Sequence, residues 1–283
     1  MNQQAKLKDK AFSWFELMKP FMECFYQPIY DTESRTIMGA EALLRVKTNE
    51  GKYLNTEEVV EEAENADWVD FLDQWMFREV CDKIPELRQY GVKRVNVNLS
   101  PVTCHDETLG QRILEYLNSR KIGKSEVCLE ITERCKSQEE GKFTALMNEM
   151  TSHGIRIALD DFGKGESNLL RMIEIPFSTI KLDKQLVWGM ADKRFATSFV
   201  DTFITFANEH KIQVTAEGVE TMWQAKRLTE MGCHYLQGSL ISKPLSYQEF
   251  CEFMREFDGE RFYQEFMKET AETRQNETDR GKK

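Results

Sequence analysis

Polar side chains interrupt seven otherwise apolar, strand-like segments, and most of them fall toward the carboxyl end of their segment. These residues are Glu41, Asn98, Glu130, Asp160, Asp161, Lys181, Glu217 and Gln237. A single one of them has a structural explanation, such as a buried ion pair, a helix cap or a lysine that reaches solvent. Unpartnered burial of all of them would cost several kcal/mol each, so their recurrence near one end of the segments indicates a functional site.

The chemistry of this set favours a metal centre. Five of the residues are carboxylates, which would repel one another unless cations lay among them, and Lys181 supplies only one positive charge. Carboxylate oxygens with the amide of Asn98 are ligands that suit Mg²⁺ or Mn²⁺. The adjacent Asp160 and Asp161 could serve two ions a few ångströms apart, which is an arrangement used for chemistry on phosphoryl oxygens.

The segments that carry these residues alternate with amphipathic, helix-like stretches. The expected strands are Cys24–Tyr30, Ile37–Val46, Val92–Ser100, Glu126–Glu133, Arg156–Phe162, Thr179–Asp183, Gln213–Val219 and His234–Gly238. Eight strands separated mostly by helices predict an α/β fold of the TIM-like (β/α)8 barrel type, in which polar groups at the carboxyl ends converge. An open doubly wound sheet is the competing fold, but no glycine-rich turn follows the first strand.

The first connection departs from the regular barrel pattern. Only Asp31–Thr36 separates the first two strands, whereas a parallel crossover needs about a dozen residues. We therefore expect an antiparallel β-hairpin, with Asp31 and Ser34 as turn formers, and a barrel in which the first strand is reversed.

Three regions are expected along the chain. Residues 1–20 carry Phe12, Trp14 and Phe15 and predict a helical lead-in, and residues 21–256 form the barrel. Residues 257–283 are expected to form a charged helix or tail. From Gln264 onward there are ten charged side chains and one Phe, which predicts a solvated segment.

Charge and cysteine usage restrict the partners and the compartment. The 283 residues include 48 acidic and 38 basic ones, for a net charge of −10. This balance disfavours a nucleic-acid duplex or an anionic membrane as the main partner, although bound metal would still allow a small anionic ligand. Seven scattered cysteines without a CxxC pair suggest neither a zinc site nor a disulfide framework. We expect a cytoplasmic protein, and no apolar run reaches the length of a membrane span.

Eight motifs occur in an order that resembles the EAL domain family of cyclic di-GMP phosphodiesterases. The similarity extends from about Phe21 to Phe253. The motifs are YQPI (26–29), EALLR (41–45), VNLSP (97–101), LEITE (129–133), LDDFGKGESNL (159–169), IKLD (180–183), AEGVET (216–221) and QGSLISKPL (237–245). Each motif is weak by itself, but eight in register are specific.

The resemblance implies hydrolysis of cyclic di-GMP to linear pGpG by a homodimeric enzyme with two Mg²⁺ or Mn²⁺ ions, in a TIM-like barrel with one antiparallel strand. Ca²⁺ is expected to permit binding and inhibit turnover, because its longer bonds misplace the water. The implied ligands of the first ion are Glu41, Asn98, Glu130 and Asp160. Those of the second ion are Asp160 and Asp161, with Glu217 supporting the metal-bound waters.

The resemblance also implies roles for residues that do not bind metal. Lys181 would orient the attacking water and help to deprotonate it, and Glu133 would anchor the loop after the fifth strand. The expected substrate-contacting or supporting residues are Gln27, Arg45, Glu220 and Gln237. The sequence departs from the family where DDFGTGYSS reads DDFGKGESN, with Lys164 and Glu166 replacing Thr and Tyr. We expect Lys164 to pair with Glu133 or Glu166 in that loop.

Two other functions remain open. The chain could be a slow EAL domain that serves as a cyclic di-GMP receptor, although the complete set of acidic residues argues against this. It could also be another metal-dependent barrel enzyme, such as an aldolase or an enolase-type lyase, which the order of the motifs disfavours.

Overall fold

Eight strands close into a barrel in the order in which they occur along the chain. The computed structural model describes residues 3–132, 140–164 and 174–268. The strands are β1 (Met22–Asp31), β2 (Thr36–Val46), β3 (Arg94–Asn98), β4 (Val127–Thr132), β5 (Arg156–Phe162), β6 (Thr179–Leu182), β7 (Gln213–Ala216) and β8 (Tyr235–Leu236). Each coincides with an expected strand, so the predicted barrel is confirmed.

The reversed first strand is also confirmed. Strand β1 pairs antiparallel with both β2 and β8, whereas all other neighbouring strands pair in parallel. The turn of the hairpin is held by Asp31, whose Oδ1 accepts the backbone N–H groups of Glu33 and Ser34 at 2.9 and 3.0 Å. This local bond satisfies backbone donors that a tight turn leaves unpaired.

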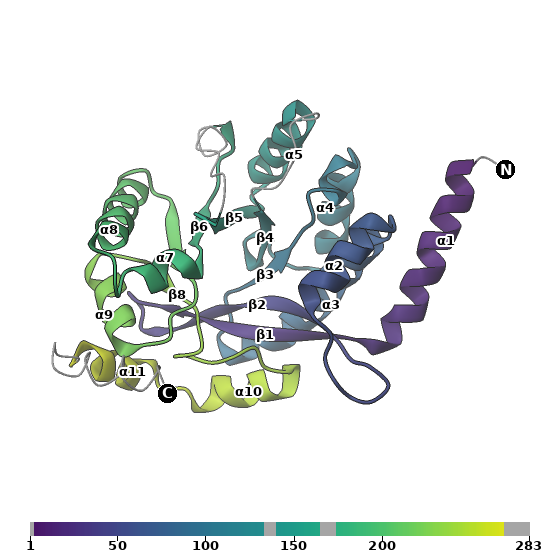
Figure 1. Ribbon diagram of the computed structural model, residues 1–283. Helices are drawn as coiled ribbons and strands as arrows, with labels where there is room; N and C mark the ends of the chain where they lie inside the picture. Colours follow the sequence, from purple (N-terminus) through teal and green to yellow (C-terminus); the bar gives the residue numbers. More distant parts are fainter. Residues whose placement is uncertain (1–2, 133–139, 165–173, 269–283) are drawn as a thin grey trace.

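Helices surround the barrel, and β1 and β2 run side by side across it (Figure 1). They are α1 (Gln3–Met18), α2 (Thr56–Asn65), α3 (Val69–Leu87), α4 (Leu109–Arg120), α5 (Glu140–Ser152), α7 (Lys184–Gly189), α8 (Arg194–Glu209), α9 (Met222–Glu230), α10 (Tyr247–Glu256) and α11 (Gly259–Met267). Residues that accept backbone N–H groups start several of them, for example Thr221, which forms a capping box with Gln224 at α9. Within the described ranges, no helix has both the length and the apolar character needed to cross a bilayer.

Alternation along the strands separates an apolar layer from a polar barrel interior. In β3, Val95 and Val97 belong to the hydrophobic core, while Asn96 and Asn98 bond to carboxylates on other strands. Because side chains alternate between the two faces of a strand, Arg94 shares the inward face with these two asparagines. The interior therefore carries the chemistry, and the layer between strands and helices supplies most of the apolar burial.

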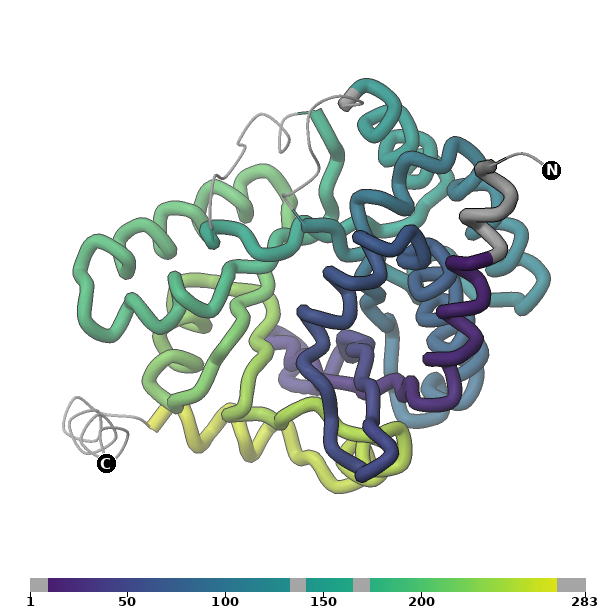
Figure 2. Tube along the Cα trace, turned by 45° about the vertical axis from the view of Figure 1, so that its right-hand side comes forward, coloured from purple at the N-terminus to yellow at the C-terminus, as the bar shows by residue number. Residues whose placement is uncertain are grey.

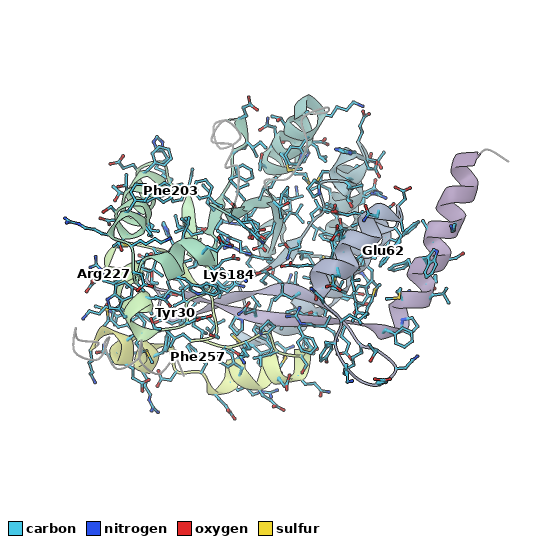
Figure 3. The ribbon with its side chains drawn as sticks, viewed as in Figure 1. Tyr30, Glu62, Lys184, Phe203, Arg227 and Phe257 are labelled. Carbon is cyan, nitrogen blue, oxygen red and sulfur yellow. The ribbon has the colours of Figure 1, made fainter. Side chains whose placement is uncertain are left out.

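The two terminal helices pack on different parts of the barrel (Figure 2). Helix α1 lies beside α3, where Phe15 stacks on Phe71, as expected for a helical lead-in. Figure 3 shows Tyr30 and Phe257 close together near α10 and α11. There Phe262 and Phe266 are also buried and contact the Tyr30 ring edge-to-face.

The expectation of a solvated segment from Gln264 is wrong for its first residues. Phe262 and Phe266 are four residues apart and therefore lie on the same face of α11, and Phe266 is fully buried. The charged side chains of this helix occupy its other face. The proposed division of the chain at residues 20 and 256 remains a prediction.

Candidate active site

A fully buried lysine lies at the centre of the acidic side chains. Lys181, on β6, is 0% exposed. Its Nζ lies 2.7 Å from Glu130 and Glu217, 3.0 Å from Glu41 and 3.1 Å from Asp160. These four carboxylates come from β2, β4, β5 and the residue that follows β7. Side chains that are far apart in the sequence thus converge at the carboxyl ends of the parallel strands.

The exit of β6 is fixed by Asp183, two residues after the lysine. Asp183 is buried and is the N-cap of α7, where its side chain accepts the backbone N–H of Gln185 at 2.8 Å. A capped helix that starts directly after the strand holds the strand end in place. This arrangement positions the backbone from which Lys181 extends into the barrel.

Amide side chains bind the carboxylate of Glu41 from two sides. Asn98 Nδ2 donates to Glu41 Oε1 at 2.9 Å, and Gln237 Nε2 donates to Glu41 Oε2 at 2.7 Å. Gln237 also donates to Gln27 Oε1 at 3.2 Å, and Gln27 Nε2 donates to the carbonyl of Ser242 at 3.1 Å. The structure therefore places Gln27 and Gln237 directly beside the acidic cluster.

An irregularity in β5 brings two adjacent aspartates to the same side. Consecutive residues of a regular strand point to opposite faces, but the pairing of β5 with β6 shifts register between Leu159 and Phe162. Within this shift Asp161 has φ +59°, in the left-handed region that Asp tolerates better than most residues. As a result, carboxylate oxygens of Asp160, Asp161 and Glu217 all lie within 4.8 Å of one another.

Burial and mutual repulsion perturb the protonation of this cluster. Burial raises the pKa of Glu130 and of Asp160, and it raises the pKa of Glu217 to about 8. Burial also opposes ionisation of Glu41, but Lys181 and the donors from Gln237 and Asn98 overcome it and hold the pKa of Glu41 below its usual value. Burial disfavours the charged form of Lys181, but the surrounding carboxylates raise its pKa well above the usual range. The lysine is thus an ammonium group that partly neutralises an excess of negative charge.

The donor set fits hard divalent cations. It consists of carboxylate oxygens and an amide, and one of its buried atoms, Asp160 Oδ1, accepts no well-directed hydrogen bond although it lies 3.1 Å from Lys181 Nζ. The single ammonium group of Lys181 cannot balance the four carboxylates that surround it. Oxygen-rich, partly unsatisfied sites of this kind are suited to Mg²⁺ or Mn²⁺.

Three other expected site residues lie outside the acidic cluster or outside the described residues. Arg45 is half-buried on β2, four residues beyond Glu41, and its guanidinium donates to the carbonyl of Leu44 at 2.7 Å. Glu220 is exposed after β7, where its backbone N–H donates to Gln224. Glu133 lies outside the described residues, as does Glu166.

The lysine that replaces the usual threonine has an acidic partner that the sequence did not predict. Lys164 Nζ lies 3.1 Å from Asp161 Oδ2, and both side chains are partly exposed. The expected partners, Glu133 and Glu166, fall outside the described residues. Lys164 thus contacts a carboxylate that was expected to bind a metal ion.

One residue of this network was not expected from the sequence. Asn96 is buried on β3, and its Nδ2 donates to Glu130 Oε1 at 2.7 Å. It lies two residues before Asn98 and thus on the same face of the strand. That spacing is the sequence signal that could have identified it.

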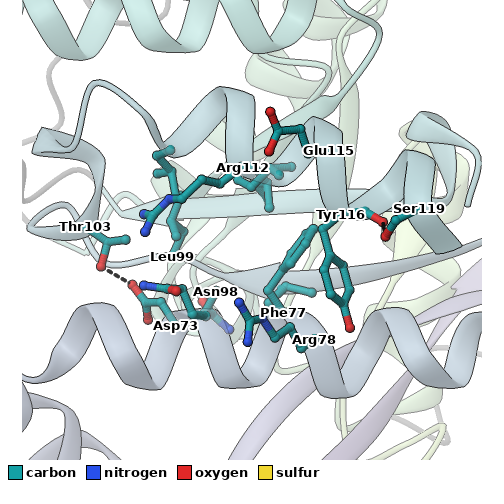
Figure 4. A pocket seen from close by; sticks show the side chains of 15 residues that line it. Asp73, Phe77, Arg78, Asn98, Leu99, Thr103, Arg112, Glu115, Tyr116 and Ser119 are labelled. Carbon is teal, nitrogen blue, oxygen red and sulfur yellow. Dashed lines mark hydrogen bonds between the residues drawn. The ribbon is translucent and has the colours of Figure 1, made fainter. Parts of the chain in front are cut away.

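A separate cavity of about 350 Å³ lies between α3 and α4 (Figure 4). Its lining includes Asp73, Phe77, Tyr116 and Arg112, and Asn98 is the residue that it shares with the acidic site. Asp73 Oδ2 accepts from Thr103 Oγ1 at 2.6 Å and from the backbone N–H of Ser100 at 2.9 Å. Burial raises the pKa of Asp73 to about 7. The carboxylates that converge on Lys181 do not line this cavity, so we assign it no part in the acidic site.

The sequence is similar to one protein family and to curated members of it. The sequence model described as "EAL domain" matches residues 19–244. The probable cyclic di-GMP phosphodiesterase PdeN of Escherichia coli K12 is 30% identical over 233 residues, which cover 81% of this chain and 45% of that protein. The chain spans less than half the length of the most similar curated relatives.

Solved structures share the fold. The cGMP-bound form of the EAL enzyme Bd1971 superimposes with a TM-score of 0.80 at 25% identity and covers 89% of this chain and 69% of that one. The c-di-GMP complex of the PaMucR phosphodiesterase gives 0.76 at 24% identity, with coverage of 87% and 99%. Because the family model matches most of its length, this chain belongs to the EAL domain family.

Proposed function

We propose that this chain hydrolyses cyclic di-GMP to linear pGpG with the help of two Mg²⁺ or Mn²⁺ ions. The observation that carries the proposal is the convergence of five carboxylates and Asn98 around Lys181 at the carboxyl end of the barrel. The naming of PdeN as a probable cyclic di-GMP phosphodiesterase supports the choice of substrate.

The metal ligands are proposed from this geometry. Glu41, Asn98, Glu130 and Asp160 would hold the first ion, and Asp160 with Asp161 the second. Glu217, whose carboxylate lies within 4.8 Å of both aspartates, would support the bound waters. When bound, two such ions make hydroxide available near neutral pH and stabilise charge on phosphoryl oxygens.

The remaining residues would position the reactants. Lys181 would orient the attacking water through its ammonium group, which the carboxylates already hold in a fixed position. The water oxygen bonds to phosphorus, the bond from phosphorus to the 3′-oxygen breaks, and that oxygen takes up a proton. Gln27, Arg45, Glu220 and Gln237 are the proposed substrate contacts, and Gln27 and Gln237 lie nearest to the reacting centre.

We also propose that the chain forms a homodimer through α8. Phe195, Phe199 and Phe206 are 82%, 38% and 44% exposed, and their spacing of four and seven residues places them along one stripe of the helix. Exposed aromatic stripes of this kind are typical of protein interfaces. Light scattering on a Phe195→Ser/Phe206→Ser variant should report a monomer, and a dimer of unchanged stability would contradict this interface.

A cytoplasmic location is part of the proposal. The six cysteines in the described part of the chain form no disulfide with one another, and reduced cysteines are usual in a reducing compartment. Degradation of the chain by an added protease only after cell lysis would support this location, whereas degradation in intact cells would contradict it.

The activity is tested by incubating the chain with cyclic di-GMP and Mg²⁺ or Mn²⁺ and separating the products by chromatography. Hydrolysis predicts linear pGpG that is absent when EDTA is present. Bound but intact cyclic di-GMP would instead identify a receptor. Absence of both binding and hydrolysis would contradict the assignment of the substrate.

A further inference from the structure

Two arginines occupy the barrel interior at the end opposite the acidic cluster. Arg94 is the first residue of β3 and Arg156 the first residue of β5. Each lies four residues before an inward-facing residue of the acidic site, Asn98 or Asp160, and so shares its face of the strand. Four residues of strand correspond to about 13 Å. The arginines therefore form a separate layer near the amino-terminal floor of the barrel.

The two guanidinium groups contact two side chains that are hydrogen-bonded to each other. The Arg94 guanidinium lies 5.5 Å from the centre of the Tyr235 ring on β8. Arg156 Nη2 donates to Gln213 Oε1 on β7 at 2.7 Å, and Gln213 Nε2 donates to Tyr235 Oη at 2.6 Å. Since Gln213 and Tyr235 are bonded to each other, the arginines converge on one region although they start two strands apart.

Neither arginine has a balancing carboxylate in the part of the chain that the structure describes. Lys181 is contacted by four carboxylates, but no ion pair within 4.0 Å involves Arg94 or Arg156 among residues 3–132, 140–164 and 174–268. Arg94 is only 5% exposed, yet its Nε and Nη2 have no hydrogen-bond acceptor, and the same holds for Arg156 Nε. Three buried, charged donors therefore face the interior without acceptors.

The groups around them are neutral and include another unused donor. Thr179 on β6 pairs across the ladder with Gln213, the partner of Arg156, and its Oγ1 is buried and has no hydrogen-bond partner. Cys128 pairs with Arg156 across the β4–β5 ladder and is fully buried, and its side chain is a thiol rather than a carboxylate. Burial, followed by repulsion from Arg94, lowers the pKa of Arg156. Buried guanidinium donors without acceptors are unfavourable unless an anion accompanies them.

We propose that the floor of the barrel binds a small oxyanion of the phosphate class between Arg94 and Arg156. Guanidinium groups present N–H donors in a planar fork that matches the oxygens of phosphate. The unpaired donors of both arginines and the hydroxyl of Thr179 provide the required hydrogen bonds. Arg156 and Gln213 are partly exposed, so the anion would enter from the amino-terminal side of the barrel.

This anion site is distinct from the proposed catalytic site. Asn96 lies between the two layers, and its Nδ2 is directed to Glu130, while its Oδ1 has no partner. The carboxylates around Lys181 would repel the same anion. The proposal therefore does not depend on the proposed hydrolysis of cyclic di-GMP.

The test is calorimetric titration of the full chain with inorganic phosphate, in EDTA and at an ionic strength held constant with chloride. The parent should show saturable binding. Arg156→Gln and Arg94→Gln should each weaken it by at least about tenfold, as expected when a charged donor is removed. The matched control is Arg261→Gln, which changes an exposed arginine on α11 and should leave the affinity within about twofold of the parent value.

A second readout protects the test against variants that fold poorly. Thr179→Val keeps the shape and both charges, removes one donor, and should weaken phosphate binding by a smaller factor than either arginine substitution. Phosphate should also raise the melting temperature of the parent more than that of Arg156→Gln. The site would be overturned by the absence of saturable binding, by arginine variants that bind phosphate as tightly as the parent, or by an equal phosphate-induced rise in the melting temperatures of the parent and Arg156→Gln. Hydration would then remain as the role of these donors.

Discussion

Replacement of Lys181 by Met should destabilise the metal-free protein strongly. Met has a similar length but no charge, so the substitution leaves four carboxylates within the barrel without the ammonium group that lies 2.7–3.1 Å from them. Removing one partner of a buried ion pair typically costs about 3–5 kcal/mol. For a domain of this size that corresponds to a fall of roughly 6–20 °C in the melting temperature.

The loss should depend on pH and on metal. Without Lys181 the already raised pKa values of Glu130, Asp160 and Glu217 rise further, and the lowered pKa of Glu41 rises as well. The native state of the variant therefore binds protons that the unfolded state has released. Its free energy of unfolding therefore falls, relative to the parent, as the pH rises from about 5 to 8. Mn²⁺ should reduce the difference in free energy of unfolding between the variant and the parent, because the bound ion replaces the lost positive charge.

Urea unfolding at pH 5 and pH 8, with EDTA or saturating Mn²⁺, measures both effects. Lys193→Met is the matched control, because Lys193 is exposed, and it should stay within about 0.5 kcal/mol of the parent. Turnover by Lys181→Met should also fall by about 10²–10⁴-fold, as expected when a group that acts on the attacking water is lost. Equal stability of Lys181→Met and the parent in EDTA at pH 8 would refute this account of the cluster.

Four further outcomes are expected. Glu41→Gln should abolish hydrolysis and leave the circular dichroism spectrum unchanged; an unfolded variant would indicate a structural role instead. Lys164→Thr should tighten Mn²⁺ binding by up to about fivefold in calorimetry, because Lys164 no longer competes with the metal for Asp161 and such a partly exposed ion pair is worth at most about 1 kcal/mol. Weaker Mn²⁺ binding by this variant would contradict competition between Lys164 and the metal. Burial raises the pKa of Asp73 from 3.8 to about 7, so this group lowers the free energy of unfolding as the pH rises from 4 to 7. Asp73→Asn should reduce that pH-dependent fall, measured by urea unfolding, by up to about 4 kcal/mol. Mn²⁺ affinity should increase from pH 6 to pH 8, because Glu217, with a pKa of about 8, must lose its proton to take part; a flat profile would argue against its participation.

The barrel could be predicted because its determinants are local. Eight apolar segments have strand length, and the short Asp31–Thr36 connection allows only a hairpin. The partners of Lys181 follow from the same reasoning, because parallel strands bring their carboxyl ends together. Glu41, Glu130, Asp160 and Glu217 were all expected there and do lie there.

Other features depend on tertiary geometry that the sequence does not display. The register shift that turns Asp161 toward Asp160 arises from the pairing of β5 with β6, and the Lys164–Asp161 contact depends on it. The contacts of Arg94 with Tyr235 and of Arg156 with Gln213 require the barrel to close. Burial of Phe266 depends on the position of α11 against Tyr30, which a count of charged residues could not reveal.

The most direct test of the proposed chemistry is hydrolysis of cyclic di-GMP in H₂¹⁸O with Mg²⁺ or Mn²⁺, followed by mass spectrometry of the product. Attack of water on phosphorus predicts linear pGpG with one ¹⁸O in its terminal phosphate, and no product in EDTA. An unlabelled phosphate would contradict attack of water on phosphorus, and recovery of intact cyclic di-GMP would contradict the hydrolytic function itself.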